Sequence, residues 1–237
     1  MTAKMIYLAR RNPALAREAF PRRWRQHAKL AGTLPDVVGV ATSVHYCTVV
    51  PGRELYANNR DEYDGVGLVG VADERQLAEM HRQTVSNPVT REDELKVFST
   101  YVEKFALFAR ERVLTDRGPG KAVLIEFVPR RPGVSPADFE RIYTTEFAPR
   151  TGALLRGAPL LKLLRRYVQN IVVPPGPPPG YEFDAVAELW FDSLEDLRTA
   201  MAPCAQLDAL VAAAGEFIDM SRIVQVATEV THAWKAP

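Results

Sequence analysis

Two glutamates lie inside short apolar segments that are typical of β-strands. Glu126 falls within residues 122–128 and Glu188 within residues 184–191. Successive side chains of a strand point to opposite faces, so if Leu189 packs on helices, Glu188 faces the other way. The same reasoning places Glu126 inside, away from the helices. A carboxylate in an apolar cavity has a raised pKa, so both glutamates are candidate general acids or bases.

A structural role for these glutamates remains open. Arg165 and Arg166 belong to a neighbouring predicted strand and could pair with either carboxylate. The two carboxylates could also lie at the mouth of the cavity. Buried ion pairs shift pKa values as catalytic sites do, so the pattern alone does not separate the two roles.

His27 is the third candidate for acid–base chemistry. It follows Phe20 by seven residues and Trp24 by three, which places it on the apolar stripe of a predicted helix, near the C-terminal end. The helix dipole favours an imidazolium there. A hydrogen bond from the ring to a backbone carbonyl is the alternative. His45 lies in the next predicted strand and could face either the cavity or the helices.

Composition excludes several classes of partner. The chain is 47% apolar and 25% charged with a net charge of +1, so it lacks the basic stripe that nucleic-acid binding requires. No segment is long enough to cross a bilayer, and the first basic residues come too early for a signal peptide. Only two cysteines occur. We therefore expect a cytoplasmic protein without nucleic-acid or membrane partners.

Sequence motifs also exclude several chemistries. The chain has no glycine-rich phosphate loop, no His-Glu-x-x-His and no Gly-x-Ser-x-Gly. Four histidines and two cysteines show no spacing typical of a metal site. We expect neither a metal nor a cofactor.

The two halves of the chain resemble each other. At an offset of about 119 residues, the matches are Pro13 with Pro132, Phe20 with Phe139, Trp24 with Tyr143 and Tyr63 with Phe183. Near the end the offset falls to 112, where Phe105 matches Phe217. This predicts about eight extra residues in the first half, in a polar loop at 83–94. The copies are too long for a solenoid repeat, so we predict two domains, residues 1–118 and 119–237.

Each half has the same predicted order of elements, βαββαβ. Ser135 and Pro136 are typical of a helix start, and Pro203 interrupts the last helical region. The order predicts two ferredoxin-like α+β domains. Their strands are apolar on both faces, so each sheet needs cover on both sides. The predicted strands are residues 4–9, 38–49 and 64–71 in the first half, and 122–128, 163–172, 184–191 and 223–230 in the second.

Several segments resemble the EthD family of dimeric α+β barrels. They are residues 131–139 (RPGVSPADF), 184–192 (DAVAELWFD), 216–222 (EFIDMSR) and Thr228-Glu229. The resemblance implies two four-stranded sheets that pack face to face as an α+β barrel. Closure within one chain and closure across a homodimer are both compatible with it. It also implies a histidine at the position of His27, where the second half has Glu146. Haem is a minor alternative, because other branches of this superfamily carry it.

Two functions are compatible with these features. The first is a cofactor-independent lyase, isomerase or monooxygenase that binds a hydrophobic, aromatic or polyketide-like molecule in the barrel cavity. The second is a non-catalytic binding or accessory protein of a degradation or biosynthetic pathway. The candidate catalytic residues are His27, Glu126 and Glu188, and the candidate substrate-binding residues are Tyr7, Trp24, His45, Glu146, Arg166, Tyr167 and Trp190.

Overall fold

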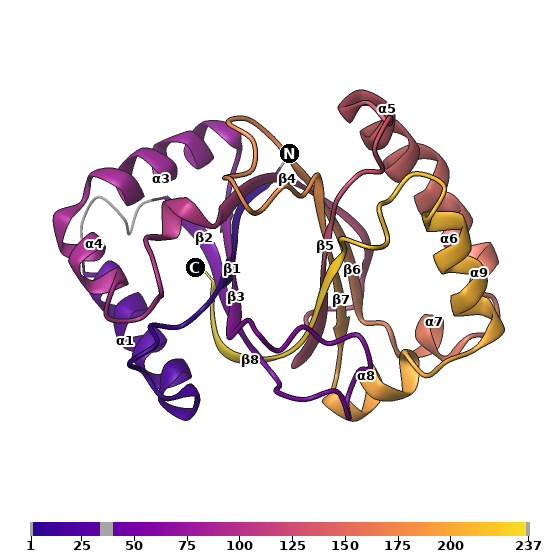
Figure 1. Cartoon of the computed structure of the whole chain (residues 1–237), viewed down its shortest axis with the longest axis horizontal. Helices are drawn as coiled ribbons and strands as arrows, with labels where there is room; N and C mark the ends of the chain where they lie inside the picture. Colours follow the sequence, from indigo (N-terminus) through magenta and orange to yellow (C-terminus); the bar gives the residue numbers. More distant parts are fainter. Residues whose placement is uncertain (1, 34–39, 236–237) are drawn as a thin grey trace.

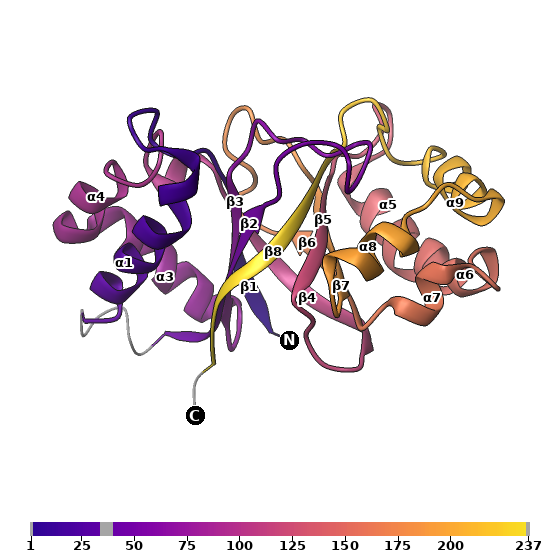
Figure 2. The same cartoon turned by 90° about the horizontal axis from the view of Figure 1, so that it is seen from below.

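Eight antiparallel strands form a closed barrel at the centre of the molecule. The computed structural model describes residues 2–33 and 40–235. The strand order around the barrel is β1-β3-β2-β8-β5-β7-β6-β4. The helices lie outside it in two layers, on opposite sides (Figures 1 and 2). The expected α+β barrel is therefore confirmed.

The elements follow the predicted order within each half. The first half contains β1 (Ala3–Ala9), η1 (Arg17–Ala19), α1 (Phe20–Ala31), β2 (Ala41–Val49), β3 (Gly65–Val71), α3 (Glu74–Ser86), α4 (Pro88–Glu94), η2 (Val102–Lys104) and β4 (Ala106–Asp116). The second contains β5 (Ala122–Val128), α5 (Pro136–Arg141), η3 (Ile142–Phe147), α6 (Ala148–Leu154), α7 (Pro159–Leu163), β6 (Arg166–Val172), β7 (Ala185–Phe191), α8 (Leu194–Ala200), α9 (Ala205–Ala214) and β8 (Val224–Lys235). Residues 38 and 39 of one predicted strand lie outside the described residues.

Two seams join the halves into one barrel. β2 of the first half pairs with β8 of the second, and β4 pairs with β6. Both seams are made by strands of the same chain, so the barrel closes without a second copy. Closure removes the sheet edges, which would otherwise expose unpaired backbone groups.

The strand residues divide between the barrel interior and the helix layers. Ile6, Val186 and Trp190 belong to the apolar cluster inside the barrel, whereas Leu189 and Phe191 pack with helix residues. The alternation predicted for β7 is therefore correct. The phase predicted for β5 is wrong: its isoleucine and phenylalanine line the interior.

Residues 83–94 are helical, contrary to the predicted loop. α3 runs through Ser86, and α4 begins at Pro88. The Asn87 side chain accepts hydrogen bonds from Val89 N (3.0 Å) and Thr90 N (3.2 Å). An Asn N-cap followed by proline starts a helix strongly, so Asn87-Pro88 was the signal in the sequence.

The offset between the halves does not fall to 112. Arg11 forms a bridge with Phe98, and Arg130 forms one with Ile218. Arg11 and Arg130 are 119 residues apart, and Phe98 and Ile218 are 120 apart, so the offset between the halves stays at 119 to 120 on both sides of the bridge. The predicted extra residues in the first half are therefore not seen. The exact division into residues 1–118 and 119–237 stays a prediction.

Candidate functional site

Two apolar cavities lie between the barrel wall and the helices. The larger, of about 820 Å³, lies under the helices of the second half, and the smaller, of about 400 Å³, lies in the first half. The barrel interior is instead filled by tightly buried side chains, most of them apolar, together with a buried ion pair of Lys4 and Glu188. The predicted barrel cavity is therefore corrected: the cavities are outside the wall.

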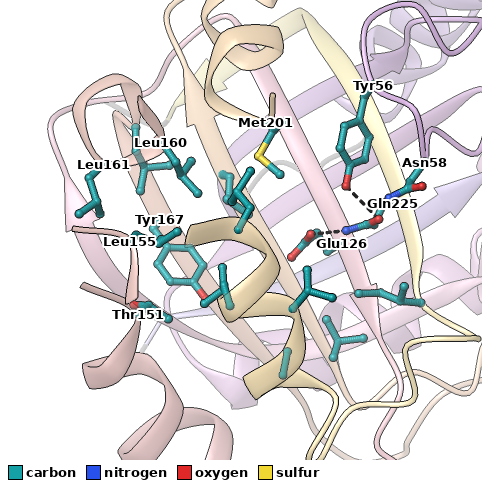
Figure 3. Close-up of a pocket in the computed structure, with 18 of the residues that line it drawn as sticks. Tyr56, Asn58, Glu126, Thr151, Leu155, Leu160, Leu161, Tyr167, Met201 and Gln225 are labelled. Carbon is teal, nitrogen blue, oxygen red and sulfur yellow. Dashed lines mark hydrogen bonds between the residues drawn. The ribbon is translucent and has the colours of Figure 1, made fainter. Parts of the chain in front are cut away.

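The larger cavity is enclosed by both halves of the chain. Its roof comes from helices α6 to α9, with side chains such as Leu155, Leu160 and Met201 (Figure 3). The first half contributes the loop of residues 53–58 and the end of β4, including Arg112. The lining is mainly apolar, which suits a hydrophobic ligand.

Of the three carboxylates that line the larger cavity, Glu54 and Asp208 are exposed, and only Glu126 is partly buried. It points from β5 towards the helices, the opposite face from the one predicted, because Ile125 and Phe127 occupy the barrel interior. Its neighbour across the β5–β7 pair is Ala187, whose small side chain leaves room above the sheet. Burial raises the pKa of Glu126, and a hydrogen bond from Gln225 opposes the shift only in part.

A chain of hydrogen bonds connects Glu126 to the first half. Gln225 Nε2 donates to Glu126 Oε1 at 2.5 Å, and Tyr56 Oη donates to Gln225 Oε1 at 3.0 Å. Figure 3 shows this chain at one side of the cavity. Among the described residues, Gln225 is the only hydrogen-bond partner of Glu126. The second carboxylate oxygen of Glu126 is therefore available to a ligand.

Asn59 holds the loop that carries Tyr56. Asn59 is fully buried, and its Nδ2 donates to Val50 O (2.7 Å) and Gly52 O (2.8 Å). Its Oδ1 accepts from Ala227 N of β8 at 2.9 Å. One amide thus closes the loop and fastens it to the strand that carries Gln225.

Two further phenols border the larger cavity. Tyr167 and Tyr143 line it, and burial raises the pKa of both, that of Tyr167 to about 12. Gln169 Nε2 donates to Tyr143 O at 3.2 Å and approaches Tyr167 Oη at 3.4 Å. Both tyrosines are therefore neutral at ordinary pH and can donate hydrogen bonds.

Tyr143 lies in η3, which is a π-helical turn. The wider turn rotates the residues that follow it, and such turns are frequent at functional sites. Glu146 in this turn is exposed and pairs with Arg141, instead of facing a cavity as predicted. A regular helical spacing cannot reveal this rotation.

The smaller cavity contains the predicted His27 and Tyr7. His27 Nδ1 is 2.9 Å from Asp93 Oδ2, and burial lowers the pKa of the imidazole. Tyr7 lines the same cavity with Tyr46. Trp24 lies behind them, stacked on Tyr46 at a centroid distance of 4.3 Å. Trp24 thus supports the wall rather than lining it.

Glu188 lies inside the barrel, as predicted, but its partner differs from the predicted arginines. Lys4 Nζ is 2.6 Å from Glu188 Oε1 and 2.9 Å from Glu111 Oε1. Asn170 Nδ2 (2.8 Å) and Trp190 Nε1 (2.9 Å) also donate to Glu188. This carboxylate is fully buried and saturated with donors, which is typical of a structural ion pair.

The other predicted residues also surround this interior ion pair. His45 contacts Trp190 edge to face, with ring centroids 5.2 Å apart. Arg166 pairs with Glu111 and Asp116, each at 3.0 Å. The predicted site is thus divided among the two cavities and the barrel interior. Its members do not form one site.

The sequence patterns do not indicate several side chains of these sites. Tyr56 and Gln225 act on Glu126 from distant parts of the chain, and Lys4 reaches Glu188 across the barrel. Glu94 lines the smaller cavity and is 2% exposed. Only the strand register brings these pairs together, so no local motif could have indicated them.

The side chains do not suit haem in the larger cavity. The described residues that line it include no histidine, so it offers no axial imidazole. Within residues 2–33 and 40–235, no group of three or more His, Cys, Asp or Glu side chains could hold a metal ion. The same residues contain no helix long and apolar enough to span a membrane.

Solved structures with this architecture include proteins of several descriptions. An anthrone oxidase-like protein superposes with a TM-score of 0.63 at 12% identity, over 99% of this chain and 92% of that one. A candidate monooxygenase from Fusobacterium nucleatum subsp. nucleatum gives 0.58 at 6% identity, over 99% and 93%. A candidate chlorite dismutase gives 0.51 at 10% identity, over 97% and 94%. Identities this low establish the fold alone.

The family comparison covers the helices that roof the larger cavity. Residues 131–221 match the EthD domain. No curated protein matches the sequence. The matched region spans α5 to α9 with strands β6 and β7. The second half therefore resembles the EthD domain over residues 131–221, within an eight-stranded α+β barrel.

Proposed function

We propose that the larger cavity binds a hydrophobic polycyclic ketone and that Glu126 transfers a proton to and from it. The observation that carries this proposal is Glu126, a carboxylate with one free oxygen at the sheet side of an apolar cavity of about 820 Å³, whose other two carboxylates, Glu54 and Asp208, are exposed. Such a volume accommodates a ligand of several rings. The protein is then an enzyme of proton transfer that needs only its own side chains for this step.

Burial makes Glu126 a suitable base. A carboxyl with a raised pKa is a stronger base once ionised, and proton transfer is most efficient when the pKa lies near the working pH. Gln225 holds one oxygen, so the other points its lone pairs at the ligand. Tyr56 fixes the orientation of the Gln225 amide.

The reaction moves one proton and one electron pair. Glu126 takes a proton from a carbon activated by an aromatic ketone, and the electrons of the C–H bond move to the ketone oxygen. Tyr167 faces the same space (Figure 3), and its neutral hydroxyl donates to the developing oxyanion. Return of the proton to another carbon gives isomerisation. Addition of O2 to the carbanion gives oxygenation, as in anthrone plus O2 to anthraquinone plus water.

Anthrone is the probe that tests this proposal, because one similar structure is an anthrone oxidase-like protein. Exchange of its CH2 protons in D2O, measured by NMR without oxygen, reports proton transfer directly. Binding is measured separately by calorimetry. Glu126→Gln should lower the exchange rate by about 10²- to 10⁴-fold while binding is retained.

A matched control is Glu216→Gln, which changes an exposed carboxyl of the same half. It should exchange anthrone at the wild-type rate. Exchange by Glu126→Gln at the wild-type rate would exclude Glu126 as the base. Binding of anthrone by the wild type without any exchange would favour a non-catalytic carrier, and no binding would exclude this ligand class.

A further inference from the structure

We propose that the smaller cavity is a second ligand site, which takes a one- or two-ring phenol whose hydroxyl hydrogen bonds to Glu94. This site lies on the opposite side of the barrel from Glu126 and shares none of its lining residues. It therefore does not depend on the function proposed above.

Glu94 is the central observation. It ends α4 and is only 2% exposed, and its Oε2 accepts one hydrogen bond, from Val102 N at 3.1 Å. No partner for Oε1 is found within the described part of the chain, although Glu94 lines the cavity. A carboxylate that is nearly buried and has a single protein donor is costly. Burial raises the pKa of Glu94 to about 7. A ligand hydroxyl would supply the missing donor.

Two phenols line this cavity, and one of them lies close to the carboxylate. Tyr7 and Tyr46 both line the cavity, and the charge of Glu94 contributes to the raised pKa of Tyr7. Trp24 Nε1 donates to Tyr7 Oη at 3.3 Å, which orients the hydroxyl. The remaining lining is largely apolar. Glu94 and the nearby hydroxyl of Tyr7 thus offer polar contacts within this lining, which recognition of a ligand hydroxyl requires.

Gly67 allows Tyr7 to take its position. A Cβ at residue 67 would lie 2.2 Å from Tyr7 Cζ, so the ring rests directly on the β3 backbone. The equivalent contact in the second half joins Glu126 to Ala187. The Tyr7 ring, held between Gly67 and the rings of Trp24, Phe98 and Phe105, therefore has a fixed position in the wall of the smaller cavity.

Size and charge define the ligand class. The cavity has about half the volume of the larger one, which favours one or two rings. The lysine that lines it, Lys29, is on the exposed side of α1, so no buried ammonium favours an anion. Trp234, 40% exposed at the end of β8, offers an aromatic contact from the second half. A neutral phenol satisfies all three conditions.

The test compares 2-naphthol with naphthalene by calorimetry. Glu94→Gln should weaken the binding of 2-naphthol by about tenfold or more, since hydrogen bonds to charged groups contribute about 1.5–3 kcal/mol. Naphthalene lacks the hydroxyl and should bind both proteins equally. Equal losses for the two probes, or no loss for 2-naphthol, would overturn the proposed contact.

A pair of blocking variants locates the site. Ala28→Phe fills the smaller cavity from α1, and Gly152→Phe enters the larger one from α6, where an added Cβ meets nothing within 4 Å. We expect 2-naphthol affinity to fall at least tenfold in Ala28→Phe and to stay within twofold in Gly152→Phe. The reverse pattern would refute the assignment. If Ala28→Phe does not fold, Ala31→Phe replaces it, since Ala31 lines the same cavity and is not among the residues packed against the core cluster of the first half. Anthrone exchange should persist in either α1 variant, which separates this test from that of Glu126.

Discussion

Substitution of Glu94 by glutamine should stabilise the folded protein by an amount that grows with pH. Burial moves the pKa of this carboxyl from 4.5 to about 7 in the folded protein. At about 1.4 kcal/mol per pH unit, this corresponds to about 3 kcal/mol. Below pH 4.5 both states are protonated, so the carboxyl adds no penalty. Between pH 4.5 and 7 the unfolded chain releases its proton first, and the wild type loses stability until pH 7.

Urea unfolding at pH 5, 6, 7 and 8 measures this difference. Glu94→Gln keeps the shape and can still accept from Val102 N, so it should exceed the wild type by only about 1 kcal/mol at pH 5 and by about 3 kcal/mol at pH 8. Glu92→Gln, on the exposed side of the same helix, is the control and should change stability by less than about 0.5 kcal/mol. A stability difference between Glu94→Gln and wild type that does not grow with pH would refute the reasoning.

Three further predictions concern the barrel and the loop of residues 53–58. Lys4→Met should lower the free energy of unfolding in urea by about 3–5 kcal/mol, because it leaves the buried Glu188 charge without its cation. Wild-type stability would show that the donors Asn170 and Trp190 are enough for this carboxylate. Asn59→Ala should cost about 2–3 kcal/mol and speed hydrogen exchange at Ala227 N, whose acceptor is lost; unchanged exchange would contradict that contact. Tyr56→Phe should keep stability within about 1 kcal/mol yet slow anthrone exchange several-fold, and an unaffected rate would exclude Tyr56 from positioning Gln225.

The sequence predicts the barrel well because its strands are apolar on both faces. In β7 the alternation of large apolar residues determines the phase, and Glu188 lies where expected. In β5 every residue except Glu126 is apolar, so alternation could not determine the phase. The sequence pattern predicts Glu126 inside the barrel, whereas the space for its side chain lies beneath the helices.

The site was less predictable because its contacts join distant segments. Tyr56 and Gln225 are 169 residues apart, and no motif links them. The match of Glu146 with His27 predicts a position beside a cavity, but the π-helical turn η3 leaves Glu146 exposed and paired with Arg141. Local periodicity therefore identifies which residues are buried, but the register between strands decides which of them meet.

The seams between β2 and β8 and between β4 and β6 have an evolutionary consequence. In an assembly of two identical polypeptides, any substitution appears in both pockets at once, so neither can specialise alone. Here one polypeptide supplies both sides of the barrel, and a codon change alters a single pocket. Glu126 and Tyr7 occupy matching positions on opposite sides, so selection has been free to give each its own chemistry.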